Sequence, residues 1–197
     1  GPNRVLIRHW PEGLCVANTG VPFSTGGVKA LMVGNYSPKK LARTKQIGNR
    51  GLGFRSVLSW TQAPFIISGN LHLVFSSSLA KTTLSGLVAQ SEQVQVTVEE
   101  WQRGGHEAPI PILACPAVTD GKSKTGQLDA CEAFRRMWPR ALTLREQYNT
   151  VIALPFTEPG ADNQVLEQVE SLNQELMLFL QYLEELVIET EDYKKTW

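Results

Sequence analysis

Three closely spaced glycines place the strongest constraint on how this chain can fold. Gly48, Gly51 and Gly53 follow the spacing G-x-x-G-x-G, which lets the backbone turn tightly and approach a bound group closely. The apolar segment 54–60 that follows predicts a helix start, whose free N–H groups would point into the loop. Such a loop is typical of a phosphate site, and a plain tight turn before a helix is the alternative. The spacing fits neither the dinucleotide loop nor the P-loop.

The composition indicates a single globular domain over 1–197, alone or with a small appendage. The chain has 197 residues, 42% of them hydrophobic, which is enough for one sizeable core. The formal net charge is zero, so strong attraction to nucleic acid is not expected. The three cysteines form no C-x-x-C pair, which argues against a disulfide framework or zinc site and favours a reducing compartment. No signal peptide and no run of membrane-spanning length is visible, so we expect a cytoplasmic protein without a membrane partner.

Apolar patterns along the chain predict an α/β fold. Residues 5–9 and 13–17 are typical of a hairpin, and 64–67 and 71–75 of a second strand pair. The apolar run 148–155 predicts a buried strand. Interleaved helices and hairpins of this kind favour an α/β sandwich with a mixed sheet.

Two further patterns lead to more specific predictions. Apolar residues recur at intervals of three and four over 163–184, which predicts an amphipathic helix with Asp162 as its N-cap. Residues 94–98 alternate between apolar and polar side chains, which is compatible with a strand. The segment 76–93 has a weak pattern and is open to interpretation as an insertion or a helix.

Several segments together resemble a known superfamily. Residues 45–57, around the three glycines, resemble the second glycine box of the GHKL ATPases, most closely the sacsin-type branch of the heat-shock-ninety ATP-binding domains. Residues 14–23 resemble the first glycine box, 148–155 the strand with the late threonine, and 175–184 a following helix. The resemblance covers residues 3–189 and implies the Bergerat fold, a two-layer α/β sandwich. In that fold, helices cover one face of a mixed, mostly antiparallel sheet.

The resemblance implies binding of ATP with magnesium and assigns roles to individual residues. Asn18 would accept a hydrogen bond from the adenine amino group, where most of the superfamily has Asp, although a turn-forming Asn that caps its own backbone is the alternative. Thr150 would bond near the adenine, and Lys39 would bring positive charge to the outer phosphates from a lid. The nucleotide-binding residues implied are Asn18, Gly20, Phe23, Ser37, Lys39, Gly48, Asn49, Arg50, Gly51, Leu52, Gly53, Phe54 and Thr150.

The resemblance also indicates what this segment lacks. In the superfamily, a helix before the first box carries Glu-x-x-x-Asn, whose Glu activates water and whose Asn holds magnesium. The chain begins at Gly1 in what corresponds to the strand after that helix. We therefore expect no catalytic residue here, a magnesium ligand from the missing helix, and essentially no ATPase activity from this chain alone. His9, His72 and His106 are scattered, so metal binding by them is not expected.

These observations lead to one leading hypothesis of function and two alternatives. The leading hypothesis is an ATP-binding domain of a sacsin-like GHKL protein, acting as a nucleotide-dependent switch or chaperone-like module on protein partners or other domains. The first alternative is a pseudo-ATPase that keeps the fold as an interaction scaffold. The second is an ATP-gated module of a nucleic-acid-processing or defence complex, which the neutral charge does not directly support.

Overall fold

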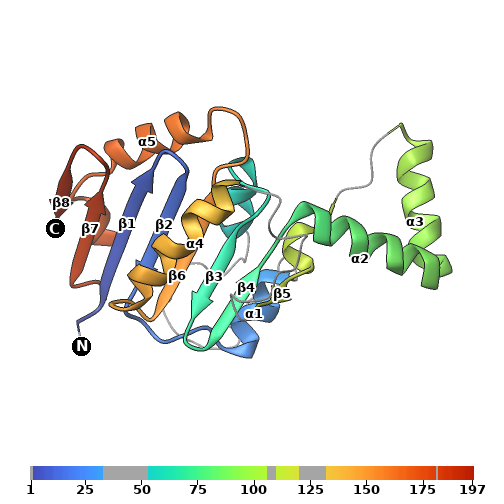
Figure 1. Cartoon of the computed structure of the whole chain (residues 1–197), viewed down its shortest axis with the longest axis horizontal. Helices are drawn as coiled ribbons and strands as arrows, with labels where there is room; N and C mark the ends of the chain where they lie inside the picture. Colours follow the sequence, from blue (N-terminus) through green and yellow to red (C-terminus); the bar gives the residue numbers. More distant parts are fainter. Residues whose placement is uncertain (1, 33–52, 106–109, 120–131, 181) are drawn as a thin grey trace.

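A mixed sheet runs through the centre of the molecule (Figure 1). The computed structural model describes residues 2–32, 53–105, 110–119, 132–180 and 182–197. Within these residues the sheet has eight strands in the order β5-β4-β3-β6-β2-β1-β7-β8. The strands are β1 (Arg4–Trp10), β2 (Gly13–Asn18), β3 (Phe65–Ser68), β4 (Leu71–Val74), β5 (Ala117–Val118), β6 (Thr150–Pro155), β7 (Glu185–Glu189) and β8 (Lys194–Thr196).

Helices of very different lengths connect these strands. The α-helices are α1 (Thr25–Met32), α2 (Ser77–Gln90), α3 (Glu92–Arg103), α4 (Glu132–Arg145), α5 (Ala161–Ser171) and α6 (Leu176–Phe179). Two 3₁₀ helices, η2 (Gly53–Ser59) and η3 (Ile112–Ala114), complete the set of helices described.

The predicted strand pairs are confirmed. β1 and β2 form an antiparallel hairpin in which Arg8 lies opposite Cys15, and β3 pairs with β4 so that Ile66 lies opposite Leu73. The predicted strand 148–155 is β6, at the centre of the sheet between β3 and β2. All the strand pairs described are antiparallel except β1 with β7. The α/β class and the mostly antiparallel, mixed sheet are therefore as the sequence predicts.

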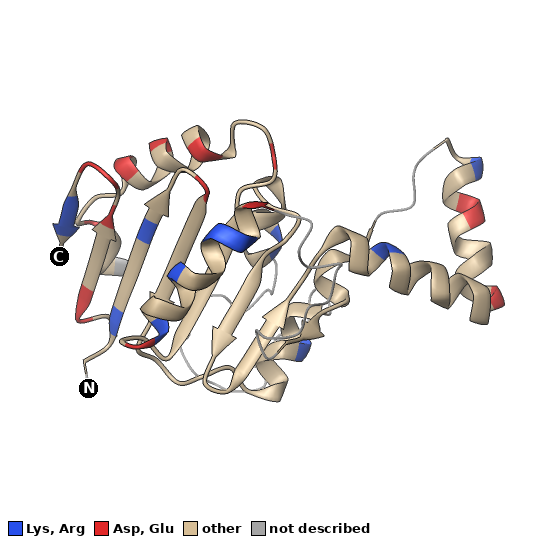
Figure 2. Cartoon of the chain, in the orientation of Figure 1, with Lys and Arg blue, Asp and Glu red and all other residues tan. Residues whose placement is uncertain are grey.

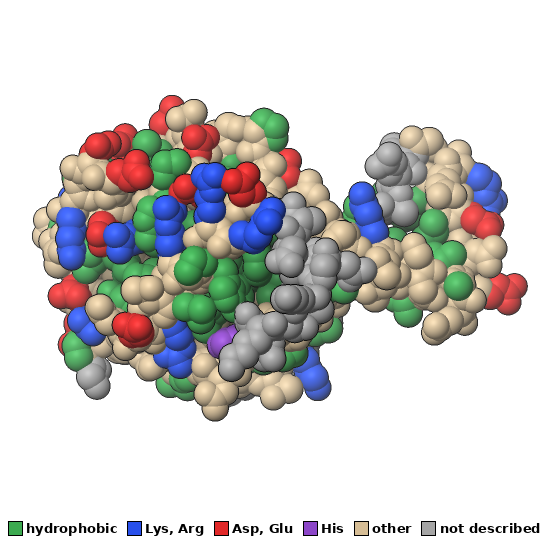
Figure 3. All heavy atoms as spheres, viewed as in Figure 1, with side chains coloured by type: hydrophobic (Ala, Val, Ile, Leu, Met, Phe, Trp, Pro, Cys, Tyr) green, Lys and Arg blue, Asp and Glu red, His purple; other side chains and the backbone are tan. Residues whose placement is uncertain are grey.

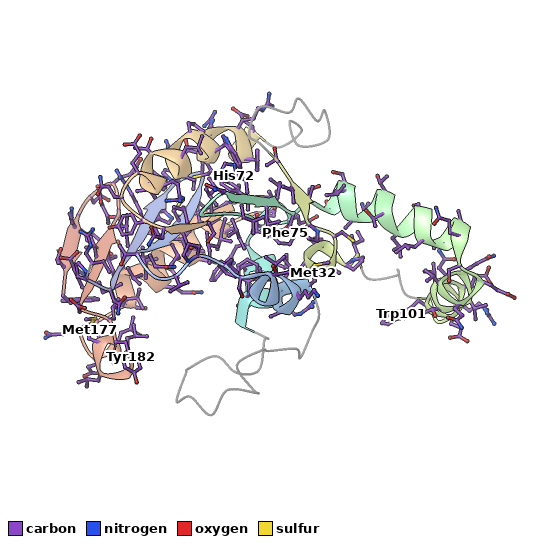
Figure 4. All side chains as sticks on the ribbon, turned by 90° about the horizontal axis from the view of Figure 1, so that it is seen from below. Met32, His72, Phe75, Trp101, Met177 and Tyr182 are labelled. Carbon is purple, nitrogen blue, oxygen red and sulfur yellow. The ribbon has the colours of Figure 1, made fainter. Side chains whose placement is uncertain are left out.

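Helices cover both faces of the sheet, which differs from the expected one-sided arrangement. Met137 and Ala141 of α4 pack on one face against Ala153 of β6. Val165 of α5 packs on the other face against Leu154, the next residue of β6. Figure 4 shows α4 and α1 on opposite sides of the sheet. The reason is that successive residues of the central strands are both apolar, so each face needs its own cover.

The helix predicted over 163–184 is shorter and interrupted. α5 ends at Ser171, Leu172 adopts an extended backbone with φ −63° and ψ 135°, and a second short helix follows after a turn. Asn173 stabilises the break, because its Oδ1 accepts a hydrogen bond from the backbone N–H of Glu175 at 3.0 Å. The predicted N-cap is also wrong: Gly160 occupies that position with φ 74°, and Asp162 lies in the first turn.

The strand proposed for 94–98 is instead part of α3. The same valines also fit a helical spacing, because Val94, Val98 and Trp101 recur at intervals of four and three. Ser91 starts the helix, since its side-chain oxygen accepts from the backbone N–H of Val94. Residues 77–90, for which the sequence left two interpretations open, form the preceding helix α2.

Helices α2 and α3 form an arm that projects beyond the β4–β5 edge of the sheet (Figure 1). Only the base of the arm is anchored, because Ala80 near the start of α2 is fully buried in a cluster with Phe75 and Leu113. No residue of α3 is buried. Beyond this anchor, the described contacts of the arm are mainly those between α2 and α3.

Candidate functional site

A row of three polar residues crosses adjacent strands at one end of the sheet. Thr150, the first residue of β6, lies opposite Asn18, the last residue of β2, and also opposite Ser68, the last residue of β3. The residues two positions along, Val16 on β2 and Ile152 on β6, pack with the apolar clusters of the face that carries α5. The polar row therefore lies at the margin of the apolar packing on the face of the sheet that carries α5.

The hydroxyls of Ser68 and Thr150 form a buried pair. Their oxygens are 2.6 Å apart, and both side chains are almost wholly buried. Ser68 Oγ also accepts a hydrogen bond from the backbone N–H of Phe23 at 2.9 Å. Because each hydroxyl carries one proton, one of the two donates to the other and the acceptor keeps its own proton for a further partner. Thr150, predicted to bond near adenine, thus has Ser68 as a protein partner that the sequence did not reveal.

Asn18 makes a tight turn with the two residues that follow it. Its Oδ1 accepts a hydrogen bond from the backbone N–H of Gly20 at 3.0 Å, so the side chain caps its own chain as the alternative interpretation foresaw. A Cβ at Gly20 would lie 3.1 Å from that oxygen, so glycine permits the close approach. The carbonyl oxygen has a second lone pair and the amide has two N–H groups, so the residue keeps capacity for a ligand.

Asn149 holds this turn from the other strand, and the sequence interpretation overlooked it. Its backbone N–H donates to the carbonyl oxygen of Asn18 at 2.9 Å. Its side-chain Nδ2 donates to the carbonyl oxygens of Thr19 at 2.8 Å and Gly20 at 3.2 Å. The signal available was an Asn at the second position of the predicted strand 148–155, a residue type that often bonds to nearby backbone.

The two phenylalanines of the predicted site belong to the same apolar cluster. Phe23 precedes α1 and Phe54 lies in η2, and both side chains are half-buried against a cluster that contains Ile66 and Phe75. Phe23 also lies against α1, because a Cβ at Gly27 would be 3.1 Å from its ring. Both residues therefore contribute to packing beside the polar row.

The remainder of the predicted phosphate site falls mostly outside the described residues. Gly53 begins η2, so the segment after the glycines is a 3₁₀ helix where the sequence predicted a helix start. Arg55, in this helix, donates to the carbonyl oxygen of Met32 at 3.5 Å. The residues that lie outside the described part are Ser37, Lys39, Gly48, Asn49, Arg50, Gly51 and Leu52.

A cluster of charges lies at the opposite end of β2 from Asn18. Glu12 pairs with Arg140 and, at 3.3 Å, with Arg136, both from α4. The hydrogen bond from Arg140 is the main reason that the pKa of Glu12 lies below its usual value. The guanidinium groups of Arg8 and Arg140 both lie over the ring of Trp10, at 4.7 and 5.1 Å from its centre. This network joins α4 to the hairpin.

Basic and acidic side chains are intermingled on the α4 face (Figures 2 and 3). Arg8, for example, pairs with Glu189 at 3.3 Å, and Arg136 pairs with Glu132 as well as with Glu12. Among the described residues of this face, such pairing therefore leaves no uniform basic patch of the kind that binds the phosphate backbone of nucleic acids.

Comparisons with known proteins leave the family open. A scan against protein-family models finds no match, and a search of curated proteins finds no sequence similar to this chain. Within the described part of the chain, no three His, Cys, Asp or Glu residues lie close enough to hold a metal ion. Among the helices described, none has the length and apolar character needed to cross a bilayer.

Proposed function

We propose that this chain is a nucleotide-binding domain of the GHKL type, with ATP as its ligand. The observation that carries the proposal is the pairing of Asn18 with Thr150. These residues come from segments far apart in the sequence, each of which resembles a different part of one nucleotide site. A shift of the strand register by a single residue would place the two side chains on opposite faces of the sheet. Their side-by-side position therefore requires the exact pairing of β2 with β6.

The base would be held at the polar row. The amide of Asn18 offers an oxygen that accepts and a nitrogen that donates, and this pair matches the amino group and adjacent ring nitrogen of adenine. The apolar cluster that includes Phe23 and Phe54 lies on the same face and would contact the flat sides of the base.

The phosphates would lie toward the glycine loop. Backbone N–H groups of residues 48–54 would donate to phosphate oxygens, as in other glycine-rich anion sites. Arg50 would add a positive charge, and Lys39 would do so from the lid. Magnesium bound with the nucleotide would supply neutralisation of the phosphate charge. Closure of the lid over ATP would then change how the domain meets its partners.

Calorimetry with a non-hydrolysable ATP analogue and magnesium tests the proposal on the whole chain. We expect saturable binding that Gly51→Val abolishes, because a branched side chain would obstruct the phosphate cradle. Gly86→Val is the matched control, since Gly86 faces open space on α2. Failure of the folded chain to bind, or equal binding by Gly51→Val and the parent, would refute the proposal.

One observation favours the interaction scaffold as a second candidate. The arm exposes apolar side chains at Leu87 and Val96, which are 47% and 43% exposed. Apolar side chains at such positions on a projecting element are suited to protein contact. A chain that binds no nucleotide but binds a protein through the arm would fit the scaffold, and deletion of residues 77–103 would abolish that contact.

A further inference from the structure

We infer that Asn149 is a positioning residue that fixes the orientation of the Asn18 amide and thereby sets selectivity for adenine over guanine. The inference rests on the proposed function, because it concerns the base at that same site. Its basis is the set of three hydrogen bonds that Asn149 donates to the carbonyl oxygens of three successive residues, Asn18, Thr19 and Gly20.

The orientation of an Asn amide decides which purine it can bind. Adenine presents an amino donor beside a ring-nitrogen acceptor, whereas guanine presents a keto acceptor beside a ring N–H donor. An amide that rotates by half a turn exchanges its oxygen and nitrogen, so a free Asn can serve either base. An amide held in one orientation serves only one of them.

The Gly20 N–H holds the Asn18 amide in a single orientation. A backbone N–H is a donor, so only the carbonyl oxygen of Asn18 can face it at the observed 3.0 Å. Rotation of the amide would set Nδ2 against that N–H, two donors facing each other, and would leave the hydrogen bond unmade. The second lone pair of the oxygen and the Nδ2 protons then meet the base in the order that adenine requires.

The single orientation of the Asn18 amide depends on the position of the Gly20 backbone, and Asn149 fixes that position. Its Nδ2 donates to Thr19 and Gly20 together, so one exposed side chain ties both peptide groups to the start of β6. From the other side, Thr19 is held by the backbone of Arg4: its N–H donates to the Arg4 carbonyl oxygen at 3.1 Å, and its hydroxyl accepts from the Arg4 N–H at 2.9 Å. These two hydrogen bonds anchor Thr19 and do not involve the atoms of Gly20. Without the Asn149 amide, the Gly20 N–H would no longer be fixed against Asn18 Oδ1.

The test measures the ratio of two affinities rather than either alone. MgATP and MgGTP are titrated into the whole chain, Asn149→Ala, and Asn70→Ala as a control, an exposed Asn in the β3–β4 turn near the same end of the sheet. We expect the parent and the control to prefer ATP, and Asn149→Ala to lower the ATP-to-GTP ratio by ~10-fold, the size of one two-bond base contact. Asn149→Asp, which keeps the size but cannot donate, should do the same.

Two results would overturn the inference. If Asn149→Ala and Asn149→Asp weaken ATP and GTP binding equally, the affinity ratio is unchanged and Asn149 has a structural role alone. If the two variants bind both nucleotides as the parent does, Asn149 has no role in selectivity. In both cases nucleotide binding by the parent would leave the proposed function standing. If the folded parent binds neither nucleotide, the proposed function fails and the inference fails with it.

Discussion

At the residue scale, the ionic network around Glu12 makes stability depend on pH. Arg140 and Arg136 hold the pKa of Glu12 below its reference value of 4.5, with the Arg140 hydrogen bond as the largest cause. A lowered carboxyl pKa means that the stabilisation is complete above the unfolded value and is lost as the pH falls through the folded value. The network should therefore contribute at neutral pH and vanish in acid.

We predict that Glu12→Gln lowers the free energy of unfolding by ~0.5–1 kcal/mol at neutral pH, a modest amount because the group is partly exposed. The difference from the parent should shrink as the pH falls through the lowered pKa of Glu12 and disappear once that carboxyl is protonated, because both side chains are then neutral. A series of urea unfolding curves from neutral to acidic pH measures this. Glu146→Gln, at an exposed position in the turn after α4, is the control. A difference that persists unchanged in acid would contradict the assignment.

The buried thiol of Cys15 gives a second prediction from the pKa. Burial raises the pKa of Cys15 to about 12, and Cys15 is fully buried between the strands and α4. Because the thiolate is the reactive form, Cys15 should resist iodoacetamide at about pH 8, while the half-buried Cys115 reacts first. Peptide mass mapping over time checks this order, with urea-unfolded protein as the control in which both react. Equal rates in the folded chain would be inconsistent with the burial.

The residues of the candidate site differ in how far the sequence alone could predict them. Asn18 and Thr150 were found because their flanking residues resemble known motifs. Ser68 and Asn149 were missed, because their roles depend on the register between β2, β6 and β3 and on the path of the turn after Asn18. Such pairing is a tertiary property that short motifs do not encode.

At the element scale, α4 is the main support of one face of the sheet. Its fully buried Met137 packs in a cluster with Trp10 and Ala153, and a Cβ at Gly13 would come within 3.0 Å of the methionine side chain. The packing there is tight, so removal of the Met137 side chain would leave a cavity rather than a relaxed surface.

We expect Met137→Ala to lower the free energy of unfolding by ~2–5 kcal/mol, the range for large-to-small changes in cores. Leu142→Ala, on the same helix but 39% exposed, should cost far less. Chemical denaturation of both variants provides the comparison. Similar losses in the two variants would mean that α4 does not pack on the sheet as described.

The elements that the sequence misjudged share a physical cause. For 94–98, an alternating pattern and a helical pattern coincide, and the Ser91 cap decides in favour of the helix. In 163–184, the apolar spacing continues beyond Ser171, but the local hydrogen bond of Asn173 breaks the helix. The hairpins were predicted because their turn residues and alternation agree. Local competition between backbone and side chains therefore accounts for the errors.

At the scale of the whole molecule, the sheet and the arm should differ in stability. β6 is central and almost entirely buried, whereas α3 has no buried residue and lies away from the sheet, as the position of Trp101 in Figure 4 shows. Regions with few buried contacts open locally without global unfolding.

The class of fold could be predicted from alternating and periodic apolar patterns. The projecting arm could not, because the weak apolar pattern of 76–93 does not indicate against which element a helix would pack.

Hydrogen exchange followed by mass spectrometry tests this difference. We predict that amides of α3 exchange at least ~100-fold faster than those of β6 in the free chain, since they need only a local opening. If the exchange rates of α3 do not change with protein concentration, no second copy of the chain packs on the arm in solution. Protection of α3 equal to that of β6 would show that the arm is buried, contrary to the fold described.

The most direct test of nucleotide binding at the polar row is hydrogen exchange in the presence of MgATP. We predict that ATP slows exchange in peptides covering 14–23 and 148–155 and leaves α3 unchanged, and that Asn18→Ala loses this protection. These two segments are joined only by the fold, so their joint protection would locate the base at the Asn18–Thr150 pair. Binding by calorimetry without protection of either segment, or the same protection in Asn18→Ala, would show that the base does not bind at the Asn18–Thr150 pair.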